Sequence, residues 1–246
     1  MFLETFLVLS TLFANPSAPA ALEPVRTATA TATKQAVSAS QVVDKVQAFY
    51  QGNRQLTAKF RQVYTNATFG KKSVSDGKVW LKKEGGKMRW DYYKRARKGA
   101  RATVNKSFLS DGNTLWAVEH DNKQYFKRSL KDAVLPVAVT FLTGQGDLSA
   151  NFNSSMDTSG KYGGKRDHVL KLVPKKPSAQ YKTLWLVVSP DNYRVTQSIV
   201  LEASGNTNHF RFFTPNFSKE VKDQWFVLNE GELRKKRYRL VQGKKK

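Results

Sequence analysis

The 246-residue sequence contains no cysteine and only three histidines, at positions 120, 168 and 209. Without cysteine the chain forms no disulfide, so hydrophobic packing alone must stabilise its core. The same absence excludes thiol nucleophiles and cysteine-ligated metal sites. It also excludes the acyl anchor that bacterial lipoproteins attach to a cysteine directly after their signal sequence.

Catalytic signatures are missing as well. The sequence has no HExxH, GxSxG, P-loop or GxGxxG motif, and these are the spacings that place a metal ligand, a nucleophile or a phosphate-binding loop. Each histidine lies in a predicted turn or at the start of a predicted strand, where a surface position is the better interpretation. We therefore expect no catalytic residue, no metal site and no cofactor, and we predict that the protein is not an enzyme.

Long apolar runs are scarce. The run FLVLSTLFA at 6–14 is too short to span a bilayer, and the tripeptide APA at 18–20 is a small-x-small site of the kind that signal peptidase cleaves. We predict a signal peptide over 1–20 and an exported mature protein. The positively charged start of such a peptide is missing, so a mis-assigned start codon or an apolar tail is the alternative. The Ala- and Thr-rich composition of 21–39 predicts a disordered linker.

Acidic residues are few, with 19 Asp and Glu against 42 Lys and Arg and a formal net charge of +23. The cations concentrate in 82–106 and in a basic C-terminal tail, 232–246. This balance favours anionic partners. Two interpretations of the tail stay open. It is either a solvated, disordered end or a segment attracted to an anionic lipid surface or an acidic receptor face.

What the sequence does contain is a regular series of secondary-structure patterns. Apolar residues at helical spacing, among them Val42, Val43 and Val46, predict an amphipathic helix over 40–51 with Ser40 as its N-cap. From residue 55 the period changes to two, and turn residues divide the chain into strands. The predicted strands are 55–65, 77–82, 87–93, 103–110, 114–119, 124–128, 168–174, 183–189, 194–203 and 209–214, with 225–228 as a further candidate.

Residues 130–148 interrupt this series. They are apolar and contain Pro136, which fits one or two short helices rather than a central strand. Consecutive antiparallel strands with two helical insertions predict a mainly β protein, built on a single highly curved antiparallel sheet that forms a half-open, incomplete β-barrel. Its concave apolar face needs a cover, and 40–51 with 130–148 are the natural pieces of a short helical lid. We predict one such domain over 40–231.

The segment GGKMRWDYY at 85–93 shows how a strand of this sheet divides its residues. Met88, Trp90 and Tyr92 share one face because successive side chains of a strand point to opposite sides. A nucleic-acid platform, a sheet over an apolar cavity and ordinary core all fit such a strand. Aromatic residues here lie among aliphatic ones, as in LWLVV at 184–188, and no RNA-binding signature is present, which argues against nucleic acid. We expect the aromatics to face apolar groups and the cations to face water.

The order of segments resembles the LolA family of periplasmic lipoprotein carriers. The run VVDKVQAFYQGNRQLTAKFRQVY, followed by GKVWLKK, GGKMRWDYY and SFLSDGNTLWAVEHDNKQ, is similar to the family's first helix, first strand and two hairpins. FLTGQGDLSANF at 141–152 resembles the family's lid helix and next strand. VLKLVPKKPSAQYKTLWLVVSPDNYRVTQSIVLEASGNTNHFRF resembles its second half, so the resemblance covers roughly 40–230.

This resemblance implies a half-barrel, closed by helices, whose apolar interior shelters the acyl chains of outer-membrane lipoproteins. It implies an inner-membrane ABC transporter complex as the donor of this cargo and a lipid-anchored outer-membrane lipoprotein receptor of the same fold as the acceptor. The receptor carries an anchoring cysteine and this chain has none, so the resemblance places it with the soluble carriers. We expect a monomer without nucleic-acid partners. The alternative is a non-catalytic binding or sensor module for another lipid, glycolipid or anionic envelope component.

Apolar side chains that the strands and lid pieces turn inward are expected to line a lipid pocket. They are Phe49, Phe60, Met88, Trp90, Tyr92, Leu109, Leu115, Leu135, Phe141, Leu142, Leu172 and Leu186. The resemblance also implies a lid lock, an arginine that hydrogen-bonds lid carbonyls and holds the empty form shut. The family's Arg-Pro is replaced here by Lys83 and Glu84, and we expect Lys83 to reach carbonyls at the ends of 130–148. Because lysine lacks the guanidinium fork, the lock is expected to be weaker, moved or lost.

Overall fold

The structure is a computed structural model that describes residues 37–94, 101–130, 142 and 146–241. The chain divides into two units, 1–36 and 37–246, and the described residues all belong to the second. The predicted signal peptide, most of the predicted 21–39 linker and most of the 130–148 insertion lie outside the described residues.

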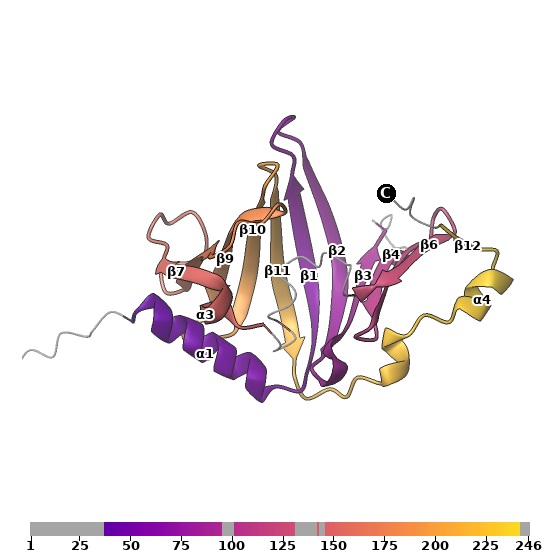
Figure 1. Cartoon of the computed structure of the whole chain (residues 1–246), viewed down its shortest axis with the longest axis horizontal. Helices are drawn as coiled ribbons and strands as arrows, with labels where there is room; N and C mark the ends of the chain where they lie inside the picture. The colour runs from indigo at the N-terminus through magenta and orange to yellow at the C-terminus, as the bar shows by residue number, and fades with distance from the viewer. Residues whose placement is uncertain (1–36, 95–100, 131–141, 143–145, 242–246) are drawn as a thin grey trace, which may run out of the picture. The chain divides into compact units, whose positions relative to one another are not determined.

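Within these residues, twelve strands form one sheet, in the order β12-β6-β5-β4-β3-β2-β1-β11-β10-β9-β8-β7 (Figure 1). The strands are β1 Gln55–Thr65, β2 Lys72–Lys82, β3 Lys87–Tyr93, β4 Val104–Ser110, β5 Thr114–Glu119, β6 Gln124–Ser129, β7 Phe152–Met156, β8 His168–Pro174, β9 Tyr181–Val188, β10 Val195–Glu202, β11 Thr207–Asn216 and β12 Arg239–Leu240. Every neighbouring pair is antiparallel except β12 with β6. The predicted fold class, one open, curved antiparallel sheet, is confirmed.

Two meanders meet at the centre of this sheet. Strands β1 to β6 run in sequence from the centre to one edge, β7 to β11 run from the other edge back to the centre, and β1 pairs with β11. Short connections of different lengths make sequence neighbours into sheet neighbours. Between β4 and β5, for example, the side chain of Asp111 accepts hydrogen bonds from the N–H groups of Asn113 and Thr114.

Helix α1 (Ala39–Gly52) begins earlier than predicted, because its N-cap is Ser38 and not Ser40. The hydroxyl of Ser38 accepts a hydrogen bond from the N–H of Gln41, and the Gln41 side chain accepts one from the N–H of Ser38. This reciprocal capping box satisfies two donors at the start of the helix. The pattern SASQ offers two serines, and only the first has Gln at the third helical position.

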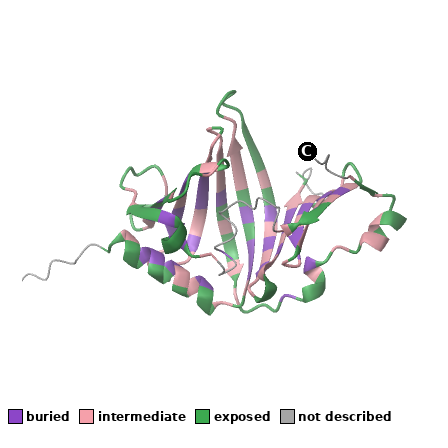
Figure 2. Ribbon diagram, in the orientation of Figure 1, coloured by how far each residue is buried: buried purple, intermediate pink, exposed green. Residues whose placement is uncertain are grey.

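The main hydrophobic core lies on the face of the sheet that α1 covers, which we call the concave face (Figures 1 and 2). The three valines on the buried side of α1 join a core that includes Leu172 and Leu186, and the helix contacts β7 and β8. The hydroxyl of Tyr50 accepts a hydrogen bond of 3.2 Å from the N–H of Val195, at the start of β10. The first predicted lid piece therefore lies on the concave face.

A C-terminal segment crosses the opposite, convex face. It contains a 3-10 helix, η4 (Asp223–Phe226), then α4 (Glu230–Lys235) and β12, so the candidate strand at 225–228 is wrong. Leu233 and Tyr238 of this segment pack on a second core, formed by Leu109, Trp116, Val118 and Tyr125. The part of the 232–246 tail that the structure describes therefore lies folded against the sheet.

The C-terminal segment also corrects the expectation that the cations of β3 face water. Arg89 donates from Nη1 to the carbonyl oxygen of Trp225 at 3.2 Å and from Nε to the Asp91 carboxylate at 3.0 Å. Asp91 is only 5% exposed and accepts a second hydrogen bond from the Ser107 hydroxyl at 2.7 Å. A buried carboxylate is tolerated when it is paired in this way, and the C-terminal segment supplies the cover.

Candidate functional site

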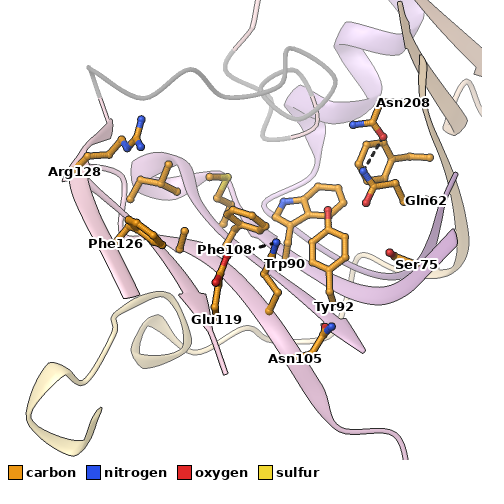
Figure 3. A pocket seen from close by; sticks show the side chains of 15 residues that line it. Gln62, Ser75, Trp90, Tyr92, Asn105, Phe108, Glu119, Phe126, Arg128 and Asn208 are labelled. Atoms are coloured by element: carbon orange, nitrogen blue, oxygen red, sulfur yellow. Dashed lines mark hydrogen bonds and ion pairs between the residues drawn. The ribbon is translucent and has the colours of Figure 1, made fainter. Parts of the chain in front are cut away.

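A cavity of about 690 Å³ lies on the concave face, over the half of the sheet that contains β1 to β6 and β11 (Figure 3). Its size falls in the range of small-molecule sites, which is roughly 300–1,000 Å³. The side chains that line it are Gln62, Ser75, Met88, Trp90, Tyr92, Asn105, Lys106, Phe108, Leu115, Ala117, Glu119, Phe126, Arg128, Asn208 and Phe210.

The middle of the cavity floor is one row of side chains across four strands. Trp90 is level with Phe108, Phe108 with Ala117, and Ala117 with Phe126. Residues opposite each other in an antiparallel ladder share a face of the sheet, so this row points together into the cavity. Ala117 is the smallest member, and it leaves space between two aromatic rings.

The cavity is charged on one side. In the next row, Tyr92 is level with Lys106 and Lys106 with Glu119, and the Lys106 ammonium lies 3.9 Å from the Glu119 carboxylate. Hydrogen bonds from the side chains of Asn122 and Gln124 lower the pKa of Glu119 below its usual value. Burial raises the pKa of Tyr92, which keeps its phenol neutral. The lowered pKa favours the charged carboxylate of Glu119, so this side of the cavity places an ion pair beside the apolar floor.

The polar lining comes mostly from one end of the strands. Gln62 donates a hydrogen bond of 2.7 Å to Asn208 across the central β1–β11 ladder, and Ser75 and Asn105 lie near the starts of β2 and β4 (Figure 3). We call this the polar end of the cavity. At the other end Met88 and Leu115 make the lining apolar, and the charged residue there is Arg128 of β6.

The predicted pocket residues divide into groups. Met88, Trp90, Tyr92 and Leu115 line the cavity. Phe60 is buried directly against it, since its ring centroid lies 5.0 Å from those of Trp90 and Tyr92.

Other predicted residues lie in the same core but away from the cavity lining. Phe49, Leu142, Leu172 and Leu186 belong to the part of the core that includes α1. Leu109 lies on the convex face instead, because it is level with Arg89 in the β3–β4 ladder. Leu135 and Phe141 lie outside the described residues.

Several lining residues were not predicted from the sequence. In SFLSDG, Phe108 and Leu109 are both apolar, so alternation alone does not say which one points inward. In QYFKR the same holds for Tyr125 and Phe126. The registers of two ladders decide these cases: the β3–β4 ladder aligns Phe108 with Trp90, and the β5–β6 ladder aligns Phe126 with Ala117.

Lys83 contacts the helix that covers the concave face. Its ammonium donates a hydrogen bond of 2.7 Å to the carbonyl oxygen of Gln51, in the last turn of α1. A cation is favourable there because the last carbonyls of a helix have no partner within it. The residue therefore reaches 40–51, the first of the two predicted lid pieces, while the carbonyls of 130–148 that we expected it to reach lie mostly outside the described residues.

A Ser-His-Asp constellation exists on the convex face, but its geometry is structural. The Ser107 hydroxyl bonds both Asp91 and, at 3.1 Å, His120 Nε2, while His120 Nδ1 lies 3.0 Å from the Tyr238 hydroxyl. In a catalytic triad the histidine stands between the other two groups; here the serine does, and it is 2% exposed. His120, expected at the surface, is half-buried and ties the C-terminal segment to β4.

Two further findings concern the described residues alone. In that part of the chain, no three His, Cys, Asp or Glu side chains are placed to hold a metal ion. None of its helices has the length and apolarity that a membrane span requires.

An open curved sheet, with a helix and an aromatic-floored cavity on its concave face, defines the architectural class of this protein. The family model "Outer membrane lipoprotein carrier protein LolA" matches residues 51–229, well over half of the chain. The chain therefore belongs to the LolA family.

Three relatives, each named outer-membrane lipoprotein carrier protein, are similar to this chain. The protein of Cupriavidus necator is 26% identical over 182 residues, which cover 72% of this chain and 79% of the relative. The protein of Chromobacterium violaceum is 28% identical over 143 residues, which cover 58% of this chain and 63% of the relative. The protein of Methylobacillus flagellatus is 29% identical over 110 residues, which cover 45% of this chain and 49% of the relative. The chain therefore spans about half the length of this relative.

Proposed function

We propose that this protein is a periplasmic carrier that binds the acyl chains of lipoproteins in the cavity on its concave face. The observation that carries the proposal is the apolar row formed by Trp90, Phe108, Ala117 and Phe126 across an otherwise open sheet. Exposing acyl chains to water costs about 25 cal/mol per Å², so a carrier must provide an apolar surface of this kind.

The contacts that the row offers also suit release. Ring and methyl groups attract an acyl chain without fixed direction, so a cargo can slide out without breaking a set of directional bonds. Trp90 adds one polar feature: its indole N–H is buried and has no acceptor among the described residues. A buried donor without an acceptor is unfavourable, and its burial keeps this N–H away from the surface that a cargo contacts.

Membership of the LolA family supports a route for the cargo. In this proposal the chain takes acylated lipoproteins from an inner-membrane ABC transporter complex and passes them to an outer-membrane lipoprotein receptor. It works as a monomer, and the basic 232–246 tail attracts an anionic lipid surface. Native mass spectrometry of protein purified from the cell envelope tests the cargo class. Co-purified lipoprotein acyl species support the carrier, whereas glycolipid alone supports the alternative binding module.

A fluorescent fatty-acyl probe tests the cavity directly. We expect saturable binding of the probe to the purified protein and its displacement by a synthetic acylated lipopeptide, because both compete for the same apolar row. The unacylated peptide is the matched control and is expected to displace nothing. Probe binding that is absent, or that the lipopeptide does not reduce, would contradict the proposal.

The contact between Lys83 and Gln51 gives a second prediction. Lys83→Leu removes the hydrogen bond that holds the end of α1 to the β2–β3 connection, so uptake of the acyl probe is expected to accelerate. The bond is solvent-exposed, so we expect a contribution of about 1 kcal/mol, or about fivefold in rate. Lys83→Arg is expected to slow both uptake and release, because the guanidinium can reach two carbonyls.

Stopped-flow rates of probe binding and release measure this effect. Lys176→Leu, a loss of one exposed charge in the β8–β9 connection, is the matched control and is expected to keep wild-type rates. Equal rates in wild type and in both Lys83 variants would show that this lysine does not control the helix.

A further inference from the structure

The turn between β1 and β2, residues 66–71, ends in an exposed aromatic side chain. β1 and β2 have 11 residues each, and their turn projects beyond the neighbouring strands (Figure 1). Phe69 in this turn is 74% exposed, more than any other large apolar side chain in the described part of the chain. Val74, on the following strand, is 60% exposed. Single exposed apolar side chains are common on proteins, and the structure and charge of the turn distinguish Phe69 from the others.

Hydrogen bonds order the turn in which Phe69 is exposed. The N–H of Asn66 donates to the carbonyl oxygen of Lys71 at 2.9 Å, and the Asn66 side chain accepts from the N–H of Phe69 at 3.0 Å. The neighbouring β10–β11 turn supports it, because the Asn206 side chain accepts from the N–H of Ala67 at 2.9 Å. Gly70 has φ +62, a conformation that glycine adopts without strain.

The charge around this tip is positive. Lys71 is the last residue of the turn and Lys72 the first of β2, and neither forms an ion pair with a described residue. No Asp or Glu occurs between residues 64 and 75, and the next acid, Asp76, pairs with Arg61 at 2.7 Å. In the adjoining turn, Glu202 accepts hydrogen bonds from Ser204 and Asn206. The tip therefore presents one aromatic ring and two ammonium groups free to meet an anion.

We propose that this tip, residues 66–72, docks the protein on an anionic lipid bilayer. Phe69 enters the interface between headgroups and acyl chains, where aromatic side chains are favoured, and Lys71 and Lys72 bind headgroup phosphates. A bilayer surrounds a projecting side chain on all sides. A specific protein partner, in contrast, needs roughly 1,200 Å² of buried surface, and a narrow tip offers far less.

The tip lies at the same end of the strands as the polar end of the cavity. Gln62 and Ser75 of the polar end lie three residues from Thr65 and Lys72, the strand ends that carry the turn. Asn208 and Asn105 lie at the same end of their strands. A protein held by the tip therefore brings the polar end of the cavity toward the membrane surface. This inference goes beyond the proposed function, because it assigns a membrane contact to the β1–β2 tip, which is neither the cavity nor the C-terminal tail.

The absence of cysteine makes the test simple, since one introduced cysteine gives one label. Thr68→Cys, labelled with an environment-sensitive fluorophore, is mixed with vesicles of phosphatidylcholine alone or with added phosphatidylglycerol. We expect a blue shift and rising intensity with the anionic vesicles only. The matched control is Asn192→Cys in the β9–β10 turn, which is expected to show no change.

Unlabelled variants give the affinities by vesicle co-sedimentation. Phe69→Ser is expected to weaken binding to anionic vesicles about fivefold. Lys71→Gln with Lys72→Gln is expected to weaken it about thirtyfold at low salt, with the difference shrinking as salt is added. Phe213→Ser, at another exposed Phe, and Lys165→Gln with Lys176→Gln are matched controls, expected to bind like the wild type.

The tip variants are expected to bind the acyl probe in solution as the wild type does, so the vesicle result stands apart from the cavity result. Wild-type vesicle affinity in both tip variants, or a label at position 68 that stays in water, would overturn the proposal. So would a wild-type protein that shows no preference for anionic vesicles. A wild-type protein that binds anionic vesicles but not the acyl probe would instead count against the proposed cavity and leave the tip proposal intact.

Discussion

Replacing Ala117 by tryptophan is expected to abolish binding of the acyl probe while leaving the protein folded. Ala117 lies between Phe108 and Phe126 in the row that forms the cavity floor, and its side chain borders open space. An indole there displaces about 100–150 Å² of acyl contact. At about 25 cal/mol per Å² the loss is about 3 kcal/mol, or about a hundredfold in affinity.

Ala117→Trp tests acyl binding in the cavity better than replacing Trp90 by a charged residue does. Trp90 is 4% exposed and packs on Phe60 and Phe210, so a carboxylate at position 90 is buried unpaired and unfolds the protein along with the site. Ala117→Trp adds volume where volume is available. Probe titration gives the affinity, and circular dichroism with thermal unfolding checks the fold. Ser155→Trp, on the exposed side of β7, is the control and is expected to bind normally.

Wild-type affinity in a folded Ala117→Trp protein would mean that the probe binds elsewhere. Reduced affinity in Ser155→Trp as well would point to a general effect of added tryptophan rather than to the cavity.

Gly77→Ala is expected to destabilise the fold by about 3 kcal/mol. Gly77 lies in β2, opposite Phe60 in β1 and Tyr92 in β3. A Cβ at position 77 would meet the Asp91 carbonyl oxygen at 2.3 Å and the Phe60 ring at 2.4 Å. The carbonyl belongs to the strand backbone, and the ring is held by Trp90 and Tyr92, so neither neighbour can move without disturbing the ladder or the core.

Urea unfolding measures this effect as a lower midpoint at unchanged slope. The matched control is Gly52→Ala at the end of α1, where a Cβ would have no neighbour within 4 Å. That variant is expected to stay within about 0.5 kcal/mol of the wild type. A Gly77→Ala protein with the wild-type midpoint would show that the Phe60 ring can leave Gly77 without cost.

Much of the fold could be predicted because local signals are strong along this chain. The bounds of β1, β3, β5 and β8 agree with the predicted ranges, since each strand is an alternating run between turn residues. β2 begins five residues before the predicted start, at Lys72, because its first half is polar and exposed. Pairing with β1 along its full length holds that half in the sheet. The periodicity of β2 alone does not reveal this pairing.

The candidate site was harder to predict, for a geometric reason. Whether Phe108 or Leu109 faces the cavity depends on the register of two strands, and a shift of one residue exchanges the faces. Arg89 is partly covered because it donates a hydrogen bond to the carbonyl oxygen of Trp225, which lies 136 residues further along the chain. Strand β12 pairs with β6 in parallel through a two-residue segment, which is too short for any periodicity. Local pattern carries no information about such distant contacts.

The junction of the two meanders at β1 and β11 also sets the order of folding. Each meander consists of hairpins between sequence neighbours, and such local contacts form early, whereas contacts distant in sequence are slow to form. Gln62 and Asn208, whose hydrogen bond crosses the junction, are 146 residues apart, and both line the cavity. We therefore expect docking of the two meanders to limit the folding rate. A chain still emerging from its synthesis, with β11 not yet made, lacks Asn208 and Phe210, so the cavity lining is complete only after the two meanders have docked.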